Sequence, residues 1–163
     1  MWFRSCPSSS SVRSFCFSSL TFFALLQIFV HFAYGLYSSS SDVVQLTDQN
    51  FAEEVIQSDG VSIVEFYAPW CGHSKKAKPE MDKLISKHDG TTMDGVNIKC
   101  SIVDSEAQKE ETKKQGVQGF PTFKAHLLKD GKELTNYVLE LPERTLSALE
   151  GAVKEAVDKI KSM

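Results

Sequence analysis

The hydrophobic residues of this chain change their spacing from one segment to the next. The runs "VSIVEFY" (61–67) and "VNIKCSIV" (96–103) are almost continuously apolar, as is typical of strands covered on both faces of a sheet. Segments 120–128 and 133–139 also resemble strands, and the Asp130-Gly131 pair between them favours a tight hairpin turn. The C-terminal segment instead repeats apolar residues at helical spacing, at Leu146, Leu149, Val153, Val157 and Ile160.

Three further helices are predicted between the strands. Their expected bounds are from a cap at Thr47 to Gly60, with Phe51, Val55 and Ile56 inside, from the turn at Cys71 to about His88, and from a cap at Asp104 or Ser105 to Gly116. Segment 88–95 is rich in glycine and is expected to be a loop, and 43–46 a brief strand. Alternating strands and helices followed by a hairpin and a helix indicate one compact α/β domain.

The first 35 residues differ from the rest. Arg4 and Arg13 are the only charges there, and an apolar run follows, with the small residues Ala33 and Gly35 at the positions that a signal peptidase requires. We therefore expect residues 1–35 to be a signal peptide, residues 36–41 a flexible lead-in, and residues 42–161 the domain. The alternative is an uncleaved membrane anchor, since residues 15–34 could span a bilayer; the polar residues within that run favour cleavage.

Cleavage would leave 16 Lys and Arg against 21 Asp and Glu, a net charge of −5, with no basic stripe that favours nucleic acid. Cys6 and Cys16 would leave with the leader, and the remaining Cys71 and Cys100 are too few for a disulfide-stapled scaffold. We expect no metal and no cofactor, because Cys71 and His73 alone cannot make a structural zinc site. The final "KIKSM" is not a retention signal of the Lys-Asp-Glu-Leu type, so the sequence predicts entry into the secretory route and leaves residence in the endoplasmic reticulum or secretion open.

Cys71 is the principal candidate for chemistry. It directly follows a predicted buried strand and opens a helix, where free backbone N–H groups and the helix dipole stabilise a thiolate. A protonated His73 would add to that effect. The alternatives are a buried structural thiol at Cys71 and a surface histidine without a role at His73.

Two motifs, "WCGH" at 70–73 and "GFPT" at 119–122, together resemble the thioredoxin fold, and more narrowly a domain of the protein disulfide isomerase family. The resemblance extends from Val43 to about Ile160. It implies an α/β thioredoxin fold, in which helices flank a central mixed sheet.

The resemblance also implies a client-binding surface. In that family the proline that corresponds to Pro121 is cis and lies against the active-site cysteine, and the backbone of the preceding residue, here Phe120, pairs with an extended client segment. Trp70 and Gly72 flank Cys71 and are expected to join this surface.

Ser74 departs from the family, whose members carry a resolving cysteine there. A hydroxyl forms no disulfide, so a client captured by Cys71 must be released by its own thiol or by an external one. This favours isomerisation or trapping over net oxidation or reduction. Cys100 is expected in the core, too deep in its strand to bridge to Cys71.

Glu65 lies within a buried strand, where an unpaired acid is costly. In the family this acid exchanges a proton with the resolving cysteine and has a lysine nearby, but Ile102 occupies that place here. We interpret the absence of both the resolving cysteine at Ser74 and the lysine at Ile102 as a sign that the proton relay is no longer in use. Arg144 stands near the place of a family arginine that can swing toward the active site; a solvated arginine at a helix start is the alternative.

The sequence thus leads to a monothiol protein disulfide isomerase-like protein of the secretory pathway, with the endoplasmic reticulum lumen favoured and secretion as the alternative. Cys71 is expected to form mixed disulfides with cysteine-containing clients and to assist their isomerisation and folding. Whether it turns over as an enzyme is left open, because a non-enzymatic client-binding or retention module would carry the same features. A monothiol glutaredoxin-like iron–sulfur carrier is a second alternative, and the leader and the Trp-Cys-Gly-His run argue against it.

Overall fold

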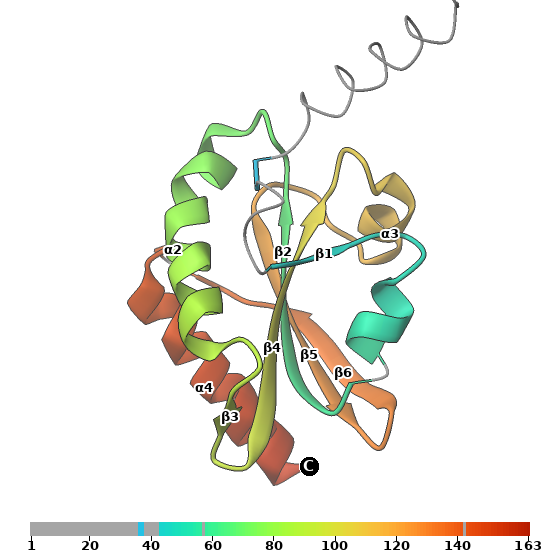
Figure 1. The fold of residues 1–163 in the computed structure, drawn as a ribbon, viewed down its shortest axis with the longest axis vertical. Coiled ribbons are helices and arrows are strands. Elements are labelled where there is room, and N and C mark those ends of the chain that lie inside the picture. Colours follow the sequence, from blue (N-terminus) through green and yellow to red (C-terminus); the bar gives the residue numbers. More distant parts are fainter. Residues whose placement is uncertain (1–35, 38–42, 57, 142) are drawn as a thin grey trace, which may run out of the picture. The chain divides into compact units, whose positions relative to one another are not determined.

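A computed structural model describes residues 36–37, 43–56, 58–141 and 143–163 (Figure 1). The predicted signal peptide, or membrane anchor, lies outside the described residues. The strands are β1 (Val44–Leu46), β2 (Gly60–Tyr67), β3 (Thr92–Met93), β4 (Val96–Asp104), β5 (Thr122–Lys129) and β6 (Lys132–Val138). The helices are the short π-helix η1 (Ala52–Ile56), α2 (Gly72–His88), α3 (Lys109–Lys114) and α4 (Leu146–Ser162). Within the described residues no helix has the length and apolar character needed to span a membrane.

The strands form a mixed sheet of six strands in the order β1-β4-β2-β5-β6, with β3 paired to β4. β1, β4 and β2 run parallel, whereas β5 and β6 are antiparallel to their neighbours. Every residue of β2 is buried, which explains the almost uninterrupted apolar run at the centre of the sheet. The predicted fold class is confirmed.

Helices cover both faces of the sheet (Figure 1). α2 and α4 lie on one face, and their apolar residues form the larger core with those of β2, β4 and β5. η1 lies on the other face, together with α3, and encloses a smaller core made of Leu46, Phe51, Val55, Val64, Phe66 and Val103. The C-terminal helix was predicted correctly, and so was the helix that follows Cys71.

The first predicted helix is shorter than expected. Thr47 and Asn50 cap one another, side chain to backbone N–H, but the helix is one short π-helical segment that ends at Ile56. Gly60 does not end it, because this glycine is the first residue of β2 and has φ +118°. A Cβ atom at Gly60 would lie 2.2 Å from the carbonyl oxygen of Asn97, so the close approach of β4 requires glycine here.

Two other boundaries were wrong. α3 begins at Lys109 rather than beside Asp104, whose carboxylate instead accepts backbone N–H bonds in the preceding turn. The expected loop at 88–95 contains the short strand β3. The hairpin was predicted correctly: Asp130 and Gly131 have φ of 54° and 68°, the left-handed pair that a tight hairpin turn needs.

The lead-in does not behave as expected at its first described residues. Tyr37 is only 3% exposed, and its ring packs edge-on against Tyr67 with 5.1 Å between centroids. The amide of Gln45 donates to the backbone oxygen of Tyr37. Residues 38–41 lie outside the described part, but Tyr37 belongs to the core of the domain, so the prediction of a flexible segment was wrong there.

Candidate active site

Cys71 caps the N-terminus of α2, as the sequence predicts. It has an extended backbone conformation, and its carbonyl accepts the first helical hydrogen bond, from the N–H of Lys75. Its own N–H donates to Ala68 at 3.0 Å, which closes the turn that leaves β2. The side chain is half-buried, so the thiol is both held by the helix start and open to solvent.

The surroundings of Cys71 lower the pKa of its thiol. The backbone N–H of Ser74 is the largest contribution, and the N–H of His73, the hydroxyl of Ser74 and the charge of Arg144 act in the same direction against the opposing effect of desolvation. These are the free donors of a helix N-terminus, directed at one sulfur. His73 contributes through its backbone, while its side chain is exposed, and a role for its charge is still a prediction.

Ser74 does more than leave out a thiol. It is fully buried, its Oγ accepts a bond from the N–H of Ala68 at 3.4 Å, and its hydroxyl is one of the groups that lower the pKa of the Cys71 thiol. The sequence interpretation treated this position as a missing cysteine, and the i, i+3 spacing at a helix start could have indicated that the hydroxyl acts on the Cys71 thiol.

The residues expected to bind clients gather around Cys71. The Phe120–Pro121 peptide bond is cis, the isomer that the resemblance implies, and the thiol of Cys71 donates to the carbonyl of Phe120 at 3.4 Å. Trp70 is 64% exposed and stands edge-on to the Phe120 ring, 6.2 Å between centroids, while Gly72 is also exposed. The reactive sulfur therefore lies beside an exposed aromatic surface and a backbone carbonyl.

Cys100 is remote from this surface. It is fully buried and pairs with Ile63, four residues before the end of β2, which corresponds to about 13 Å along the strand. Burial raises the pKa of its thiol to about 12. Both cysteines of the described residues are free, and Cys100 cannot resolve a disulfide at Cys71 without rearrangement.

Glu65 is fully buried on the face of the sheet that α2 covers, between Ile102 of β4 and Phe123 of β5. Burial raises the pKa of its carboxyl to about 7, opposed by a hydrogen bond that the hydroxyl of Tyr37 donates to Oε2 at 2.6 Å. Ile102 thus stands beside the acid, in agreement with the sequence interpretation. Tyr37 was missed, because nothing local in "LYSSSS" marks it as a partner of Glu65.

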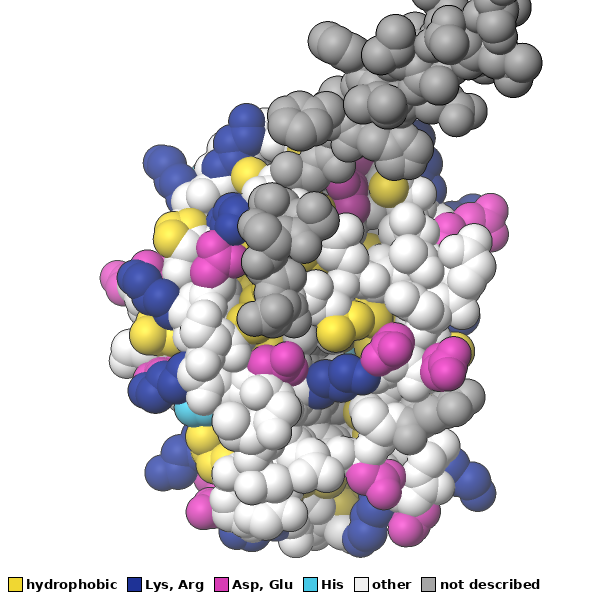
Figure 2. Space-filling view, viewed as in Figure 1, with side chains coloured by type: hydrophobic (Ala, Val, Ile, Leu, Met, Phe, Trp, Pro, Cys, Tyr) yellow, Lys and Arg dark blue, Asp and Glu magenta, His cyan; other side chains and the backbone are white. Residues whose placement is uncertain are grey.

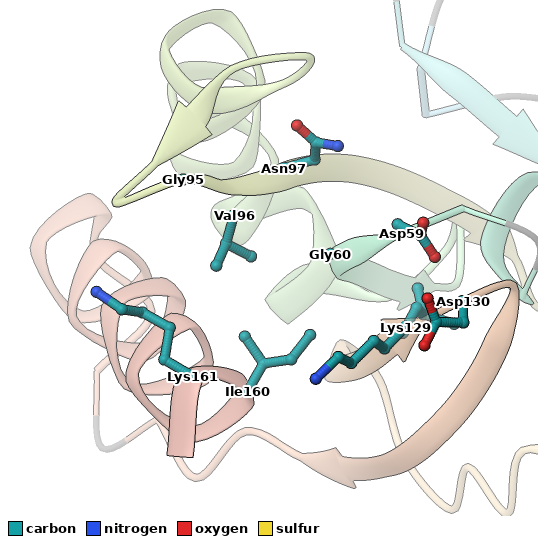
Figure 3. A pocket seen from close by; sticks show the side chains of 10 residues that line it. Asp59, Gly60, Gly95, Val96, Asn97, Lys129, Asp130, Ile160 and Lys161 are labelled. Atoms are coloured by element: carbon teal, nitrogen blue, oxygen red, sulfur yellow. The ribbon is translucent and has the colours of Figure 1, made fainter. Parts of the chain in front are cut away.

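Other surfaces carry less chemistry. Within the described residues there is no cluster of three or more His, Cys, Asp or Glu side chains that could hold a metal ion. Acidic and basic side chains are interspersed over the face in Figure 2. A hollow of about 250 Å³ lies at the start of β2, the opposite end from Cys71, with Val96 and Ile160 among its apolar lining and charged residues at its edge (Figure 3).

Comparison with known proteins agrees with this geometry. The thioredoxin family model matches residues 42–153, and the chain belongs to the thioredoxin family. Mouse protein disulfide-isomerase A6 is 49% identical over 90 residues, which cover 55% of this chain and 19% of that protein. Protein disulfide-isomerase 2-3 of Arabidopsis thaliana is 35% identical over 151 residues, covering 84% of this chain and 33% of that protein.

A solved structure, the Trx4 domain of ERdj5, has a TM-score of 0.62 at 24% identity and covers 74% of this chain and 97% of its own. At that identity the likeness concerns the fold alone. The chain spans between a fifth and a third of the length of these two curated relatives.

Proposed function

We propose that this chain is a monothiol thiol–disulfide isomerase-like protein that captures cysteine-containing clients through Cys71. The observation that carries the proposal is the pairing of an activated thiol with Ser74 at the position of a resolving thiol. Its similarity to protein disulfide-isomerases supports the same class of chemistry. We further propose the secretory pathway, and the lumen of the endoplasmic reticulum in particular, as its place of action, with secretion as the alternative.

In the proposed reaction the thiolate of Cys71 attacks one sulfur of a client disulfide. The client S–S bond breaks, a mixed disulfide with Cys71 forms, and the second client sulfur leaves as a thiolate. Another client thiolate, or a small external thiol, then attacks the mixed disulfide and frees Cys71. When a client thiolate attacks, the client cysteines have exchanged partners with no net gain or loss of electrons, which is isomerisation; release by an external thiol instead leaves that thiol joined to the client in a mixed disulfide.

Two parts of the site fit these steps. The donors from Ser74 and His73 that stabilise the Cys71 thiolate also make it a good leaving group, which favours release by an external thiol. The carbonyl of Phe120 and the exposed ring of Trp70 can receive an extended client segment beside the sulfur. Arg144 adds positive charge near the thiolate.

The test is multiple turnover on a protein with scrambled disulfides, supplied with glutathione. The natural chain should refold more than one equivalent of substrate, Cys71→Ala should abolish mixed disulfides, and Cys100→Ala should leave them intact. Ser74→Cys should shorten their lifetime at least tenfold, because an intramolecular thiol at i+3 reaches the sulfur of Cys71 with a high effective concentration.

The result also separates the second candidate, a client-binding or retention module, which the buried hydroxyl at position 74 equally favours. Stable mixed disulfides without a second round of substrate would indicate that module. Capture that survives Cys71→Ala would contradict both.

A further inference from the structure

A phenol and a carboxylic acid meet inside the domain at its redox end. Tyr37 lies before the first strand and Glu65 lies in the central strand, yet the hydroxyl of Tyr37 donates to Oε2 of Glu65 at 2.6 Å, and both side chains are almost fully buried. The other carboxyl oxygen of Glu65, Oε1, has no hydrogen-bond partner among the described residues. The two oxygens of this acid are therefore in different environments.

We propose that Tyr37 is a positioning residue of the redox site, whose hydroxyl holds Oε2 of Glu65 and thereby reserves Oε1 as the atom that takes and gives up a proton. Because Oε2 already accepts the phenol proton, the neutral acid carries its own proton on Oε1. When Oε1 loses that proton, the bond from Tyr37 stabilises the carboxylate that is left. Tyr37 would thus serve in place of the lysine that is absent at Ile102, and the acid would still transfer a proton, contrary to the interpretation from the sequence that its relay is no longer in use.

The groups that face Glu65 are few. From α2, the charge of Lys78 favours the carboxylate and that of Asp82 opposes it. From β4 and β5 the neighbours are Ile102 and Phe123, which carry no charge. Tyr67 of β2 packs on Tyr37 and titrates only well above neutral pH.

Lys78 lowers the pKa of Glu65 through its charge and also contacts Tyr37. Its Nζ lies 4.3 Å from the centre of the Tyr37 ring and is bound to Asp82 at 2.6 Å. A cation over the ring is attracted to its face and so helps to hold the Tyr37 ring in place. No Lys or Arg side chain of the described residues bonds to Glu65 directly, so Tyr37 is its one polar contact there.

The role of the pair in exchange rests on the proposed function. A client sulfur that leaves as a thiolate takes up a proton, and the proton on Oε1 of Glu65 is a buried source beneath the helix that Cys71 opens. The acid recovers its proton from solvent when the client is released, so protons balance over one cycle. Tyr37 itself gives up no proton, because burial and the neighbouring acid raise the pKa of its phenol far above neutral.

The experiment compares Tyr37→Phe with Tyr137→Phe in the otherwise unchanged chain. Tyr137 is a matched control, because Lys159 lies over its ring at 3.8 Å and its hydroxyl has no partner among the described residues. The pKa of Glu65 is measured by carbon-13 NMR of the carboxyl. Tyr37→Phe should raise it by about 1, as expected for losing one hydrogen bond to a charged group, and Tyr137→Phe should not move it.

A second readout follows the reaction. In the natural chain the rate at which Cys71 captures a client disulfide should change near the pKa of Glu65, and Tyr37→Phe should shift that step to higher pH by the same amount. The NMR titration requires no client, so it stands even if capture fails. An unmoved Glu65 pKa in Tyr37→Phe would overturn the inference.

Should Tyr37→Phe fail to fold, 3-fluorotyrosine at position 37 keeps the packing and strengthens the donor. It should lower the pKa of Glu65, and an unchanged or raised value would also overturn the inference. A moved Glu65 pKa with the same pH profile of the capture rate in both chains would confine Tyr37 to a structural bond and contradict its role in the exchange.

Discussion

Two buried ionisable side chains lie on opposite faces of the same pair of strands and are treated in opposite ways. Glu65 of β2 lies under α2 and receives a hydrogen bond from an uncharged phenol. His126 of β5 lies on the other face, beside the ring of Phe51, and its Nδ1 is 2.6 Å from Oε1 of Glu133. The acid has a neutral partner hidden with it, whereas the partner of the base is a carboxylate that is 24% exposed.

The difference shows what burial requires of each charge. Burial lowers the pKa of His126, and Glu133 opposes that effect only in part. The neutral imidazole therefore carries its proton on Nδ1, which donates to Glu133, and Nε2 is unprotonated. Burial raises the pKa of Glu65, so the acid stays neutral until the pH approaches about 7. Each face therefore avoids a buried charge. Raising the pH forces a charge onto Glu65, whereas lowering the pH forces one onto His126.

The pH ranges follow from the signs. Glu65 has a folded pKa above its ordinary value of 4.5, so it costs no stability below about 4.5, an increasing amount as the pH rises, and the full amount above about 7. His126 has a folded pKa below its ordinary 6.5, so its cost appears as the pH falls through 6.5 and grows until the folded imidazole also protonates. Below pH 6.5 the two costs therefore change in opposite directions: acid relieves the cost of Glu65 and adds that of His126.

The largest expected effect comes from Glu65→Gln. Glutamine keeps an oxygen for Tyr37 but cannot ionise, so the cost above pH 7 disappears. Relative to the natural chain, its free energy of unfolding should rise by roughly 2 to 3 kcal/mol between pH 5 and pH 8, measured by urea denaturation. An equal change at both pH values would show that ionisation of Glu65 is not the source.

A smaller effect of the opposite kind is expected from Glu133→Gln. Removing the carboxylate lowers the pKa of His126 further, so acid destabilisation extends to lower pH. The free energy of unfolding should fall by roughly 1 to 2 kcal/mol at pH 5 and change little at pH 8. Glu143→Gln, at an exposed position, is the control; a loss that is as large at pH 8 would assign the effect to packing rather than to charge.

The smallest effect distinguishes the two lysines that stand over tyrosine rings. Lys78→Gln and Lys159→Gln should each cost about 0.5 to 1 kcal/mol of stability through the lost cation–π contact. Only Lys78→Gln should raise the pKa of Glu65, and by less than Tyr37→Phe does, since Lys78 acts through space. The same NMR titration measures the pKa of Glu65 in both variants. A changed Glu65 pKa in Lys159→Gln would contradict this distinction between the two lysines.

The sequence predicted well where local pattern and tertiary structure demand the same residues. The buried strand β2 needs apolar side chains on both faces, the Asp130-Gly131 turn needs two left-handed residues, and Cys71 needs a helix start behind a strand. In each case the residues that meet the requirement are neighbours in the sequence, so the fold class and the reactive thiol could be predicted.

It failed where the determining contact is distant. Tyr37 donates a hydrogen bond to Glu65, 28 positions away, and no local sequence pattern predicts that bond. Gly60 was assigned to the end of a helix because glycine is common there, whereas the requirement comes from the backbone of β4. The roles of His73, Trp70 and Arg144 in client exchange are still predictions.

The anchoring of Tyr37 bears on where this module begins as a physical unit. The family model starts at residue 42, yet a side chain five positions earlier fills part of the main core and satisfies a buried acid. A fragment cut at residue 42, or a chimera joined there, would contain every residue that the family model matches and still have an open slot beside Tyr67 and Lys78. Transplanting this module therefore means carrying its N-terminal tyrosine along.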